Sequence, residues 1–272
     1  MRRTLAESIS FSSVGIHTGE LCAIRLHPSH NSGIIFLRNG ITIPATFRYK
    51  SDDRRSTALS HDGVSVMTVE HLLATFYAYA VDDCIVEITS GSEIPIGDGS
   101  AAMFCALLNT AGIAQTEGMP DIFVIQRPFS YEKDSVKISV EPRDITSIDF
   151  TYDGAKFGFP VQRTQIDITQ VNFERDIAPA RTFGFWEEIE YLRKNGLAVG
   201  GSFDNALVIK DGLPYNTEYR MPDEPVKHKI LDLIGDLSLA GKRFVGAFTA
   251  ERSGHYHNGR FVQCLYETMI KE

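Results

Sequence analysis

The chain has 272 residues, of which 43 % are hydrophobic and 23 % charged, and this composition excludes a disordered, collagen-like or coiled-coil protein. The formal net charge of −8 excludes the broad basic surface of a duplex-binding protein, so we expect no nucleic-acid partner. A chain of this length corresponds to about two domains.

Four cysteines are present, and none of them has the CxxC spacing of a zinc ribbon or a redox motif: Cys22, Cys84, Cys105 and Cys264. We expect them to be reduced core residues of a cytoplasmic protein. The N-terminus is basic, but no apolar segment of a secretory signal follows it. No apolar run approaches 18 residues, so we expect no membrane span.

The first half of the chain combines short apolar strands with two helices. Runs that are short, β-branched and often alternating predict strands at 21–26, 33–38, 41–47 and 83–89. Apolar runs predict helices at 68–80, with Thr68 as N-cap, and at 100–111, between Ser100 as N-cap and Gly112 as stop. The turn residues at 117–120 then break the pattern, so we place a domain boundary after residue 117.

The second half repeats this composition. Strands are predicted at 122–126, 135–140, 147–152, 165–169 and 244–250. Helices are predicted at 185–194, at 224–240 with Asp223 as cap, and at 258–270. We therefore expect an α+β protein with two similar domains, 1–117 and 118–272. Each would pair a mostly antiparallel sheet with two helices, and the helices would lie sandwiched between the two sheets.

The predicted helix 224–240 carries an unusual polar face. His228, Asp232 and Asp236 are spaced at i, i+4 and i+8, so they share one side of the helix, while apolar residues occupy much of the remaining circumference. An imidazole and two carboxylates on a buried helix are costly without partners, and a divalent metal would neutralise them. The alternative is a polar helix face with a satisfied histidine.

A second polar pair, Glu70 and His71, interrupts the apolar helix 68–80. Adjacent helical residues point about 100° apart, so one of the two could bind a metal while the other acts as a base. The alternative is a helix-start glutamate beside a core histidine.

Other histidines form weaker signals. His255 is expected on a glycine-flanked loop after strand 244–250, a position suited to catalysis, and with His257 it could form an HxH metal pair. His27 and His30 form an HxxH pair for which a solvated turn is the better interpretation. His17 lies between two glycines and could approach a ligand.

Seven sequence strings together carry a specific resemblance. They occur in order from near residue 5 to the C-terminus: VGIHTG (14–19), TVEHLLAT (68–75), EIPIGDGSA (93–101), ARTFGF (180–185), GGSFDNALV (200–208), DEPVKHKILDLIGDL (223–237) and GAFTAERSGH (246–255). With these strings the chain resembles the zinc-dependent UDP-3-O-acyl-N-acetylglucosamine deacetylases of lipid A biosynthesis in Gram-negative bacteria, the route to lipopolysaccharide.

The resemblance implies a role for each matching position. The zinc ligands would be His71, His228 and Asp232. Glu70 would be the general base, and His255, hydrogen-bonded to Asp236, the second catalytic group. Thr182 would help to stabilise the oxyanion, and Lys229 would lie beside the site. Three protein ligands leave one zinc position open, which is the pattern of catalytic sites. Ferrous iron suits the same donor set, so it is the alternative metal in vivo.

The apolar, glycine-rich segment 183–208 exceeds what a simple connection requires. The resemblance implies an inserted element at about 183–214 that forms a hydrophobic passage for the acyl chain. Its expected lining is Phe183, Trp186, Ile189, Phe203 and Val208. The alternative is a small satellite core without a ligand. Trp186 stands where a smaller, flexible side chain is expected, which predicts a narrowed passage. Arg252 is a candidate partner for the diphosphate, or else a surface cation.

The implied reaction is hydrolysis of the N-acetyl group of UDP-3-O-(acyl)-N-acetylglucosamine to the free amine and acetate. We expect a cytoplasmic monomer whose partner is this UDP-sugar lipid precursor. Two alternatives are a non-catalytic sugar-nucleotide-binding protein on the same fold and an amidase for another acetylated sugar. The first conflicts with the presence of Glu70, His255 and all three ligand residues.

Overall fold

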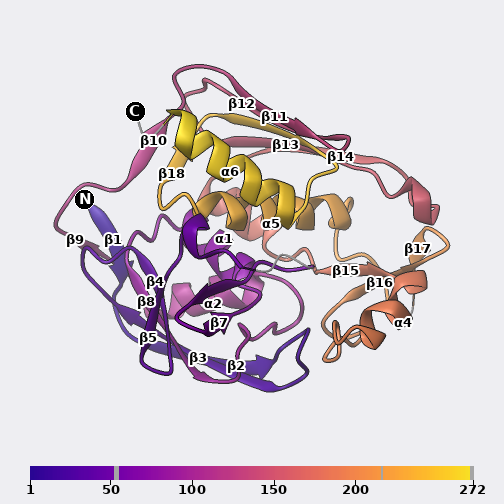
Figure 1. Ribbon diagram of the computed structural model, residues 1–272, viewed down its shortest axis with the longest axis horizontal. Coiled ribbons are helices and arrows are strands. Elements are labelled where there is room, and N and C mark those ends of the chain that lie inside the picture. Colours follow the sequence, from indigo (N-terminus) through magenta and orange to yellow (C-terminus); the bar gives the residue numbers. More distant parts are fainter. Residues whose placement is uncertain (52–54, 216, 270–272) are drawn as a thin grey trace.

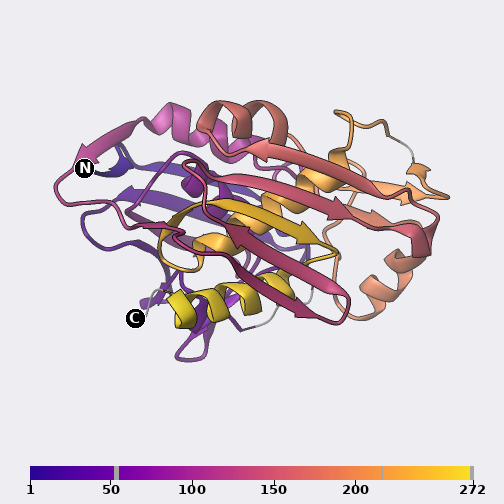
Figure 2. The ribbon, with the colours of Figure 1, turned by 90° about the horizontal axis from the view of Figure 1, so that it is seen from above.

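Two five-stranded sheets enclose a layer of helices in the computed structural model, which describes residues 1–51, 55–215 and 217–269 (Figure 1). The sheet of the first half lies on one side and that of the second half on the other. The view from above shows the strands of the second sheet lying across the helices (Figure 2). The α+β class and the helices sandwiched between two sheets are therefore confirmed.

The first sheet is built from residues 9–90. Its order across the sheet is β2 (Ile9–Val14), β3 (Leu21–Pro28), β8 (Cys84–Ser90), β4 (Ile34–Arg38) and β5 (Ile41–Pro44). The β4–β8 pair is parallel, and the other three pairs are antiparallel. The central strand, β8, is therefore the last of these five strands along the chain.

The second sheet repeats this topology. Its order is β11 (Phe129–Lys133), β12 (Val136–Glu141), β19 (Ala247–Glu251), β13 (Ser147–Tyr152) and β14 (Gln162–Asp167). Numbered along the chain within each half, both sheets read 1-2-5-3-4. Both have one parallel pair, between strands 3 and 5. The halves are thus similar in topology, although the sequence shows no strong repeat.

The four main helices occupy matching places in the two halves. In each half, one helix precedes the fifth strand and one follows it: α1 (Glu70–Ala78) and α2 (Ala102–Ala111) in the first half, α5 (Glu224–Ser238) and α6 (His255–Met269) in the second. Helices α1 and α5 pack on each other between the sheets. One hydrophobic core is continuous across both halves.

The halves differ in what is inserted between the fourth strand and the helix that follows. The first half has the hairpin β6 (Leu59–His61) and β7 (Val64–Val66). The second half has β15 (Phe183–Phe185), α4 (Trp186–Lys194), β16 (Leu207–Lys210) and β17 (Leu213–Pro214), which we call the inserted element. Its residues Phe185, Leu207 and Ile209 form a small separate core with Phe159, which precedes β14.

Short elements complete the described residues. Strand β1 (Arg2–Leu5) pairs with β9 (Ile113–Thr116), and β10 (Ile122–Val124) pairs with β18 (Arg243–Val245). Single helical turns are η1 (Phe47–Tyr49), η2 (Ala155–Phe157), α3 (Gln170–Asn172) and η3 (Phe173–Ile177). In this part of the chain, no helix is both long and apolar enough to span a bilayer.

Two expected helix starts were wrong, and a third helix begins as expected but without the expected capping bond. Helix α1 begins at Glu70, because Thr68 has a left-handed φ of 58° and its hydroxyl donates to the Glu93 carboxylate instead of capping the helix. Helix α2 begins at Ala102, although the Ser100 hydroxyl does accept from the Ala102 N–H. Asp223 stands at the N-cap position of α5 but makes no side-chain capping bond.

Two boundaries near the C-terminus also differ from expectation. The closing helix begins at His255 rather than at residue 258, so His255 is the first residue of α6 and not part of a loop. The expected strand 244–250 is divided at Gly246 into β18 and β19. The boundary after residue 117 stays a prediction.

Candidate active site

Three helices bring the sequence-predicted site residues together between the two sheets. Helix α1 carries Glu70 and His71, α5 carries His228, Asp232 and Asp236, and α6 begins with His255. All six residues are at most 8 % exposed. The site therefore combines a helix of the first half with two helices of the second.

A glycine lets the two central helices approach each other at this point. A methyl group at position 235 on α5 would lie 2.2 Å from the Glu70 carbonyl oxygen on α1. Such a distance is far inside van der Waals contact, so only glycine fits without a shift of the backbone. Gly235 thereby brings His71 within reach of Asp232.

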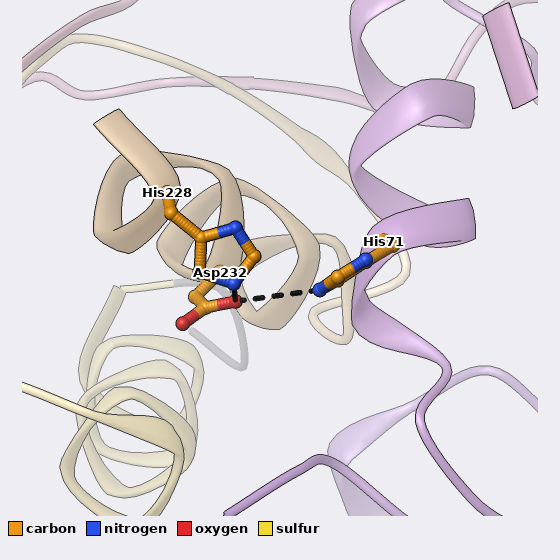
Figure 3. A group of neighbouring side chains, drawn as sticks. All are labelled: His71, His228 and Asp232. Carbon is orange, nitrogen blue, oxygen red and sulfur yellow. Dashed lines mark ion pairs between the residues drawn. The ribbon is translucent and has the colours of Figure 1, made fainter. Parts of the chain in front are cut away.

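His71, His228 and Asp232 form the first candidate metal site (Figure 3). The Asp232 Oδ1 atom lies 3.4 Å from the Nε2 atom of His228 and 3.9 Å from that of His71. His228 Nδ1 lies 3.0 Å from the Ala180 carbonyl oxygen, a contact that fixes the proton on Nδ1 and leaves the Nε2 lone pair free. The buried Nδ1 atom of His71 has no partner among the described residues.

The ionisation of these three residues suits a cation. Burial lowers the pKa of His71 to about 3 and also lowers that of His228, so both imidazoles are neutral, the form that binds metals. Burial alone would raise the pKa of Asp232. The positive charges of Lys229 and of protonated His255 outweigh it and hold that pKa below the usual range. A buried group of two neutral imidazoles and one carboxylate fits a divalent metal ion.

Glu70 and His255 face each other beside this triad. The His255 Nε2 atom lies 3.9 Å from Glu70 Oε1 and 3.8 Å from Asp232 Oδ2. These three residues form the second candidate group of metal-binding side chains. Burial raises the pKa of Glu70 to about 7. Burial opposes a charge on His255, but the Asp236 and Asp232 carboxylates outweigh it and raise its pKa to about 9. Near neutral pH, a proton acceptor thus stands next to a proton donor.

The predicted hydrogen bond between His255 and Asp236 is present, with 2.9 Å between Nδ1 and Oδ2. Two buried residues that the sequence analysis missed also bind this carboxylate. The Thr57 hydroxyl donates to Oδ1 at 2.5 Å, and the Asn258 amide donates to Oδ2 at 2.9 Å. Asn258 lies three residues after His255 on α6, a spacing that could have pointed to it. No local pattern marks Thr57.

The three other polar residues predicted for the site have different partners. Lys229 donates to Asp232 Oδ2 at 2.5 Å, so it lies beside the site as expected. Thr182 is held by its backbone, which donates to Gly99 and accepts from Leu207. Arg252 is half-exposed and paired with Asp153 at 3.0 Å, which favours the surface-cation alternative.

The expected lining of the acyl passage is partly brought together, since the Trp186 and Phe203 rings both pack on the Tyr215 ring, with centroids 4.8 and 5.9 Å apart. The Phe183 ring contacts the His228 ring edge-on, with centroids 6.1 Å apart, so it joins the inserted element to the metal-site residues. Trp186 and Ile189 line an open groove of about 620 Å³ along α4. Phe203 is 43 % exposed and Val208 is buried. Neither of these two lines that groove.

The weaker histidine signals have other partners. The His257 ring is hydrogen-bonded to the Tyr131 hydroxyl at 3.1 Å, so His255 and His257 do not converge as an HxH pair. His27 pairs with Glu87 at 2.8 Å. His17 is buried, and its Nδ1 atom accepts from the Ala198 N–H of the inserted element.

Comparison with known proteins decides the family. The family model of UDP-3-O-acyl N-acetylglycosamine deacetylase matches residues 2–267. The chain belongs to this deacetylase family. It is similar to the UDP-3-O-acyl-N-acetylglucosamine deacetylases of Thermodesulfovibrio yellowstonii (40 % identical, 98 % of this chain and 92 % of the relative) and Chromobacterium violaceum (39 %, 98 % and 91 %). That of Chlamydia pneumoniae is 38 % identical over 98 % of both chains.

Membership of the deacetylase family agrees with the resemblance found in the seven strings. The match extends over both halves and the inserted element, so it includes all three helices that meet at the site.

Proposed function

We propose that this deacetylase holds a zinc ion on His71, His228 and Asp232 and uses Glu70 and His255 for proton transfer. Its reaction is removal of the N-acetyl group from UDP-3-O-(acyl)-N-acetylglucosamine in lipid A biosynthesis. The observation that carries the proposal is the convergence of a buried two-histidine, one-aspartate triad with a base and an acid. Ferrous iron fits the same donors.

The bound metal would supply Lewis acidity, which polarises the acetamide carbonyl and makes water a better nucleophile. Glu70 then accepts a proton from the attacking water at Oε1, since its other oxygen, Oε2, already accepts the Thr57 N–H at 3.0 Å. A carboxyl with a pKa of about 7 is well matched to this task near neutral pH.

His255 is the proton donor of the proposed reaction, whereas Glu70 is the proton acceptor. Its Nδ1 proton is held by Asp236, so the Nε2 proton points to the gap beside Glu70 and Asp232. It stabilises the negative charge on the former carbonyl oxygen and donates its proton to the leaving nitrogen as the C–N bond breaks. The products are acetate and the free amine. Thr182 and Lys229 are proposed to assist at the oxyanion.

The groove along α4 is lined by Trp186 and Ile189 and by four charged side chains, Glu187, Glu190, Arg193 and Lys194. An entry of the acyl passage at Trp186 and Ile189 is therefore proposed from the resemblance, with charged residues around it. Phe183 would lie at the inner end, next to His228. Arg252 keeps only the weaker proposal of a diphosphate contact. A cytoplasmic monomer stays our sequence-based prediction.

The test is acetate release by the purified chain in metal-stripped and zinc-reloaded form. His71→Ala and Asp232→Ala should lose both bound metal and activity, whereas His27→Ala, a histidine with a partner outside the site, should keep both. Stoichiometric metal in either ligand variant would reject this ligand set. Turnover of substrates without UDP or without the acyl chain would instead favour an amidase for another sugar.

A further inference from the structure

Thr57 is the residue that joins the two proton-transfer groups across the junction of the halves. It lies just before β6 and is completely buried. Its backbone is attached to the start of α1, because its N–H donates to Glu70 Oε2 at 3.0 Å and its carbonyl oxygen accepts from the Val69 N–H at 3.2 Å. Both backbone bonds belong to the first half of the molecule.

The side chain of Thr57 reaches the second half. Its hydroxyl donates to Asp236 Oδ1 at 2.5 Å and lies 3.2 Å from His255 Nδ1. A threonine hydroxyl has one proton, and here that proton is committed to Asp236. The His255 Nδ1 proton is therefore directed to the other carboxylate oxygen, Oδ2, which also accepts from Asn258.

These contacts fix the orientation of both reacting side chains. The Thr57 N–H occupies one Glu70 oxygen, so the other, Oε1, faces the gap. The Thr57 hydroxyl holds the Asp236 carboxylate, and that carboxylate holds the His255 ring with Nε2 facing the same gap. Thr57 is thus bonded both to the base on α1 and, through the Asp236 carboxylate that Asn258 also holds, to the acid on α6.

We propose that Thr57 is a positioning residue for the deacetylation: its hydroxyl aligns the His255–Asp236 pair with Glu70. The inference rests on the proposed roles of Glu70 and His255. Thr57 itself touches no reacting atom in this scheme. Catalytic alignment is sensitive to displacements of about 1 Å, which can lower the rate by roughly 100-fold. Loss of the hydroxyl should therefore reduce kcat and leave KM and metal binding unchanged.

The first test compares Thr57→Val and Thr57→Ser in the zinc-loaded protein. Valine keeps the backbone bonds and the branched shape but lacks the hydroxyl, so kcat should fall roughly 10- to 100-fold with KM within about 3-fold and full zinc content. Serine keeps the hydroxyl and should restore kcat to within about 3-fold of wild type. The proposal is wrong if Thr57→Val keeps its kcat, or if serine fails to rescue it.

A matched control separates alignment from packing. Thr4 is also buried, and its hydroxyl donates to the Asp83 carbonyl at 2.8 Å in the region of β1 and β9, away from the site. Thr4→Val should lower the melting temperature without changing kcat. An equal fall of kcat in both valine variants would show a general loss of packing and would overturn the proposal. If Thr57→Val does not fold, the Thr57→Ser and Thr57→Ala pair tests the same hydroxyl, and equal kcat values would reject its role.

A double-variant cycle distinguishes this proposal from the function on which it rests. If Thr57 acts through Glu70 and His255, Thr57→Val should lower kcat much less in a Glu70→Gln, His255→Gln background than in wild type. An undiminished effect in that background would reject the positioning role. Near-normal kcat in Glu70→Gln and His255→Gln themselves would instead reject the proposed base and acid, whatever Thr57→Val does.

Discussion

The two halves of the molecule share one topology but contribute different chemistry. Both sheets have the strand order 1-2-5-3-4, and helices α1 and α5 precede the central strand in each. Helix α1 offers Glu70 and His71 from its first turn only. Helix α5 offers His228, Asp232 and Asp236 along three successive turns. Both candidate metal groups found among the described residues combine side chains of the two halves, so this site is formed where the halves meet.

The segments before the two insertions lie at equivalent places in the two halves, and each holds a different residue of the site. In the first half, Thr57 precedes the β6–β7 hairpin and binds Asp236 of the second half. In the second half, Ala180 precedes the inserted element, and its carbonyl holds His228. Nearby, the Ala178 carbonyl accepts from Ala101 and the Thr182 N–H donates to Gly99, both in the first half. In both halves, the segment before the insertion therefore binds a residue of the site and also bonds to the other half.

The largest effect on turnover is expected at Glu70, the proposed base, which comes from the first half. Glu70→Gln should keep its metal and lose roughly 10²- to 10⁴-fold in kcat, because no carboxylate remains to accept the proton. Metal content and acetate release measure the two properties. A variant with near-normal turnover would contradict the base assignment.

The pH profile of the wild type should reflect both halves. Turnover should fall as pH drops through the pKa of Glu70, about 7, since a protonated carboxyl cannot accept a proton. It should fall again as pH rises through the pKa of His255, about 9, since a neutral imidazole has lost the proton to be donated. A bound cation adds positive charge beside both groups and would move both limbs to lower pH. Glu70→Gln should remove the acid limb and His255→Gln the basic limb.

The next effect concerns the contact between the matching helices. Gly235→Ala would place a methyl group 2.2 Å from the Glu70 carbonyl oxygen, so α1 and α5 must separate. We expect a loss of about 1–3 kcal/mol in the free energy of unfolding, together with weaker metal binding, because His71 moves away from Asp232. Gly184→Ala, where a methyl group meets nothing within 4 Å, is the stability control. Equal unfolding midpoints for the two variants would show that the helix contact is not tight.

A second junction between the halves should affect stability but not catalysis. The buried Arg2 guanidinium binds Asp83 at 2.7 Å in the first half and Asp121 at 2.8 Å in the second. Arg2→Met would leave the buried Asp83 carboxylate without its counter-charge, held only by the Ser32 and Gly33 N–H groups, and loss of one partner of a buried ion pair typically costs about 3–5 kcal/mol. Chemical denaturation should show this loss at unchanged kcat. Arg163→Met, which breaks an exposed pair with Asp149, should change little.

The same junction predicts a pH dependence. Burial alone would raise the pKa of Asp83, but the hydrogen bond and charge of Arg2, with the Gly33 and Ser32 N–H groups, lower it below the unfolded value of about 3.9. Its stabilisation is therefore complete above that value and is lost as pH falls through the folded pKa. Below about pH 4, the free energy of unfolding of Arg2→Met should therefore fall less steeply with acid than that of the wild type. Parallel acid profiles for the two proteins would contradict this assignment.

Local periodicity was enough to predict the main helices, most strands of the two sheets and the shared helix face of His228, Asp232 and Asp236, whereas the full set of residues that meets at the site was implied by the family resemblance. It could not reveal partners that are distant in the sequence. Thr68 looks like an N-cap, but Glu93, 25 residues away, takes its hydroxyl. Thr57 is 179 residues from Asp236, and no pattern around it marks a site. His255 was expected in a loop because the glycine before it suggested one, whereas α6 begins at that histidine.

The smallest expected effect concerns the element that only the second half carries. The centroid of the Trp186 ring lies 4.8 Å from that of the Tyr215 ring, and the Lys210 ammonium lies 5.0 Å from the Trp186 ring centroid. These contacts hold the indole at the edge of the α4 groove. If this groove admits the acyl chain, a flexible side chain here should widen it. Trp186→Met should raise kcat/KM for longer or bulkier chains by a few-fold.

The acyl-length profile decides between a passage and a satellite core. Each buried methylene contributes about 0.8 kcal/mol, so removing several carbons from the chain should lower kcat/KM of the wild type by orders of magnitude. Tyr191→Met is the control, because Tyr191 is on the same helix and 65 % exposed but does not line the groove. It should leave the length preference of the wild type unchanged, whereas Trp186→Met should shift it. Indifference to acyl length in all three proteins would mean that the inserted element is only a small core, and that the difference between the halves has no part in substrate selection.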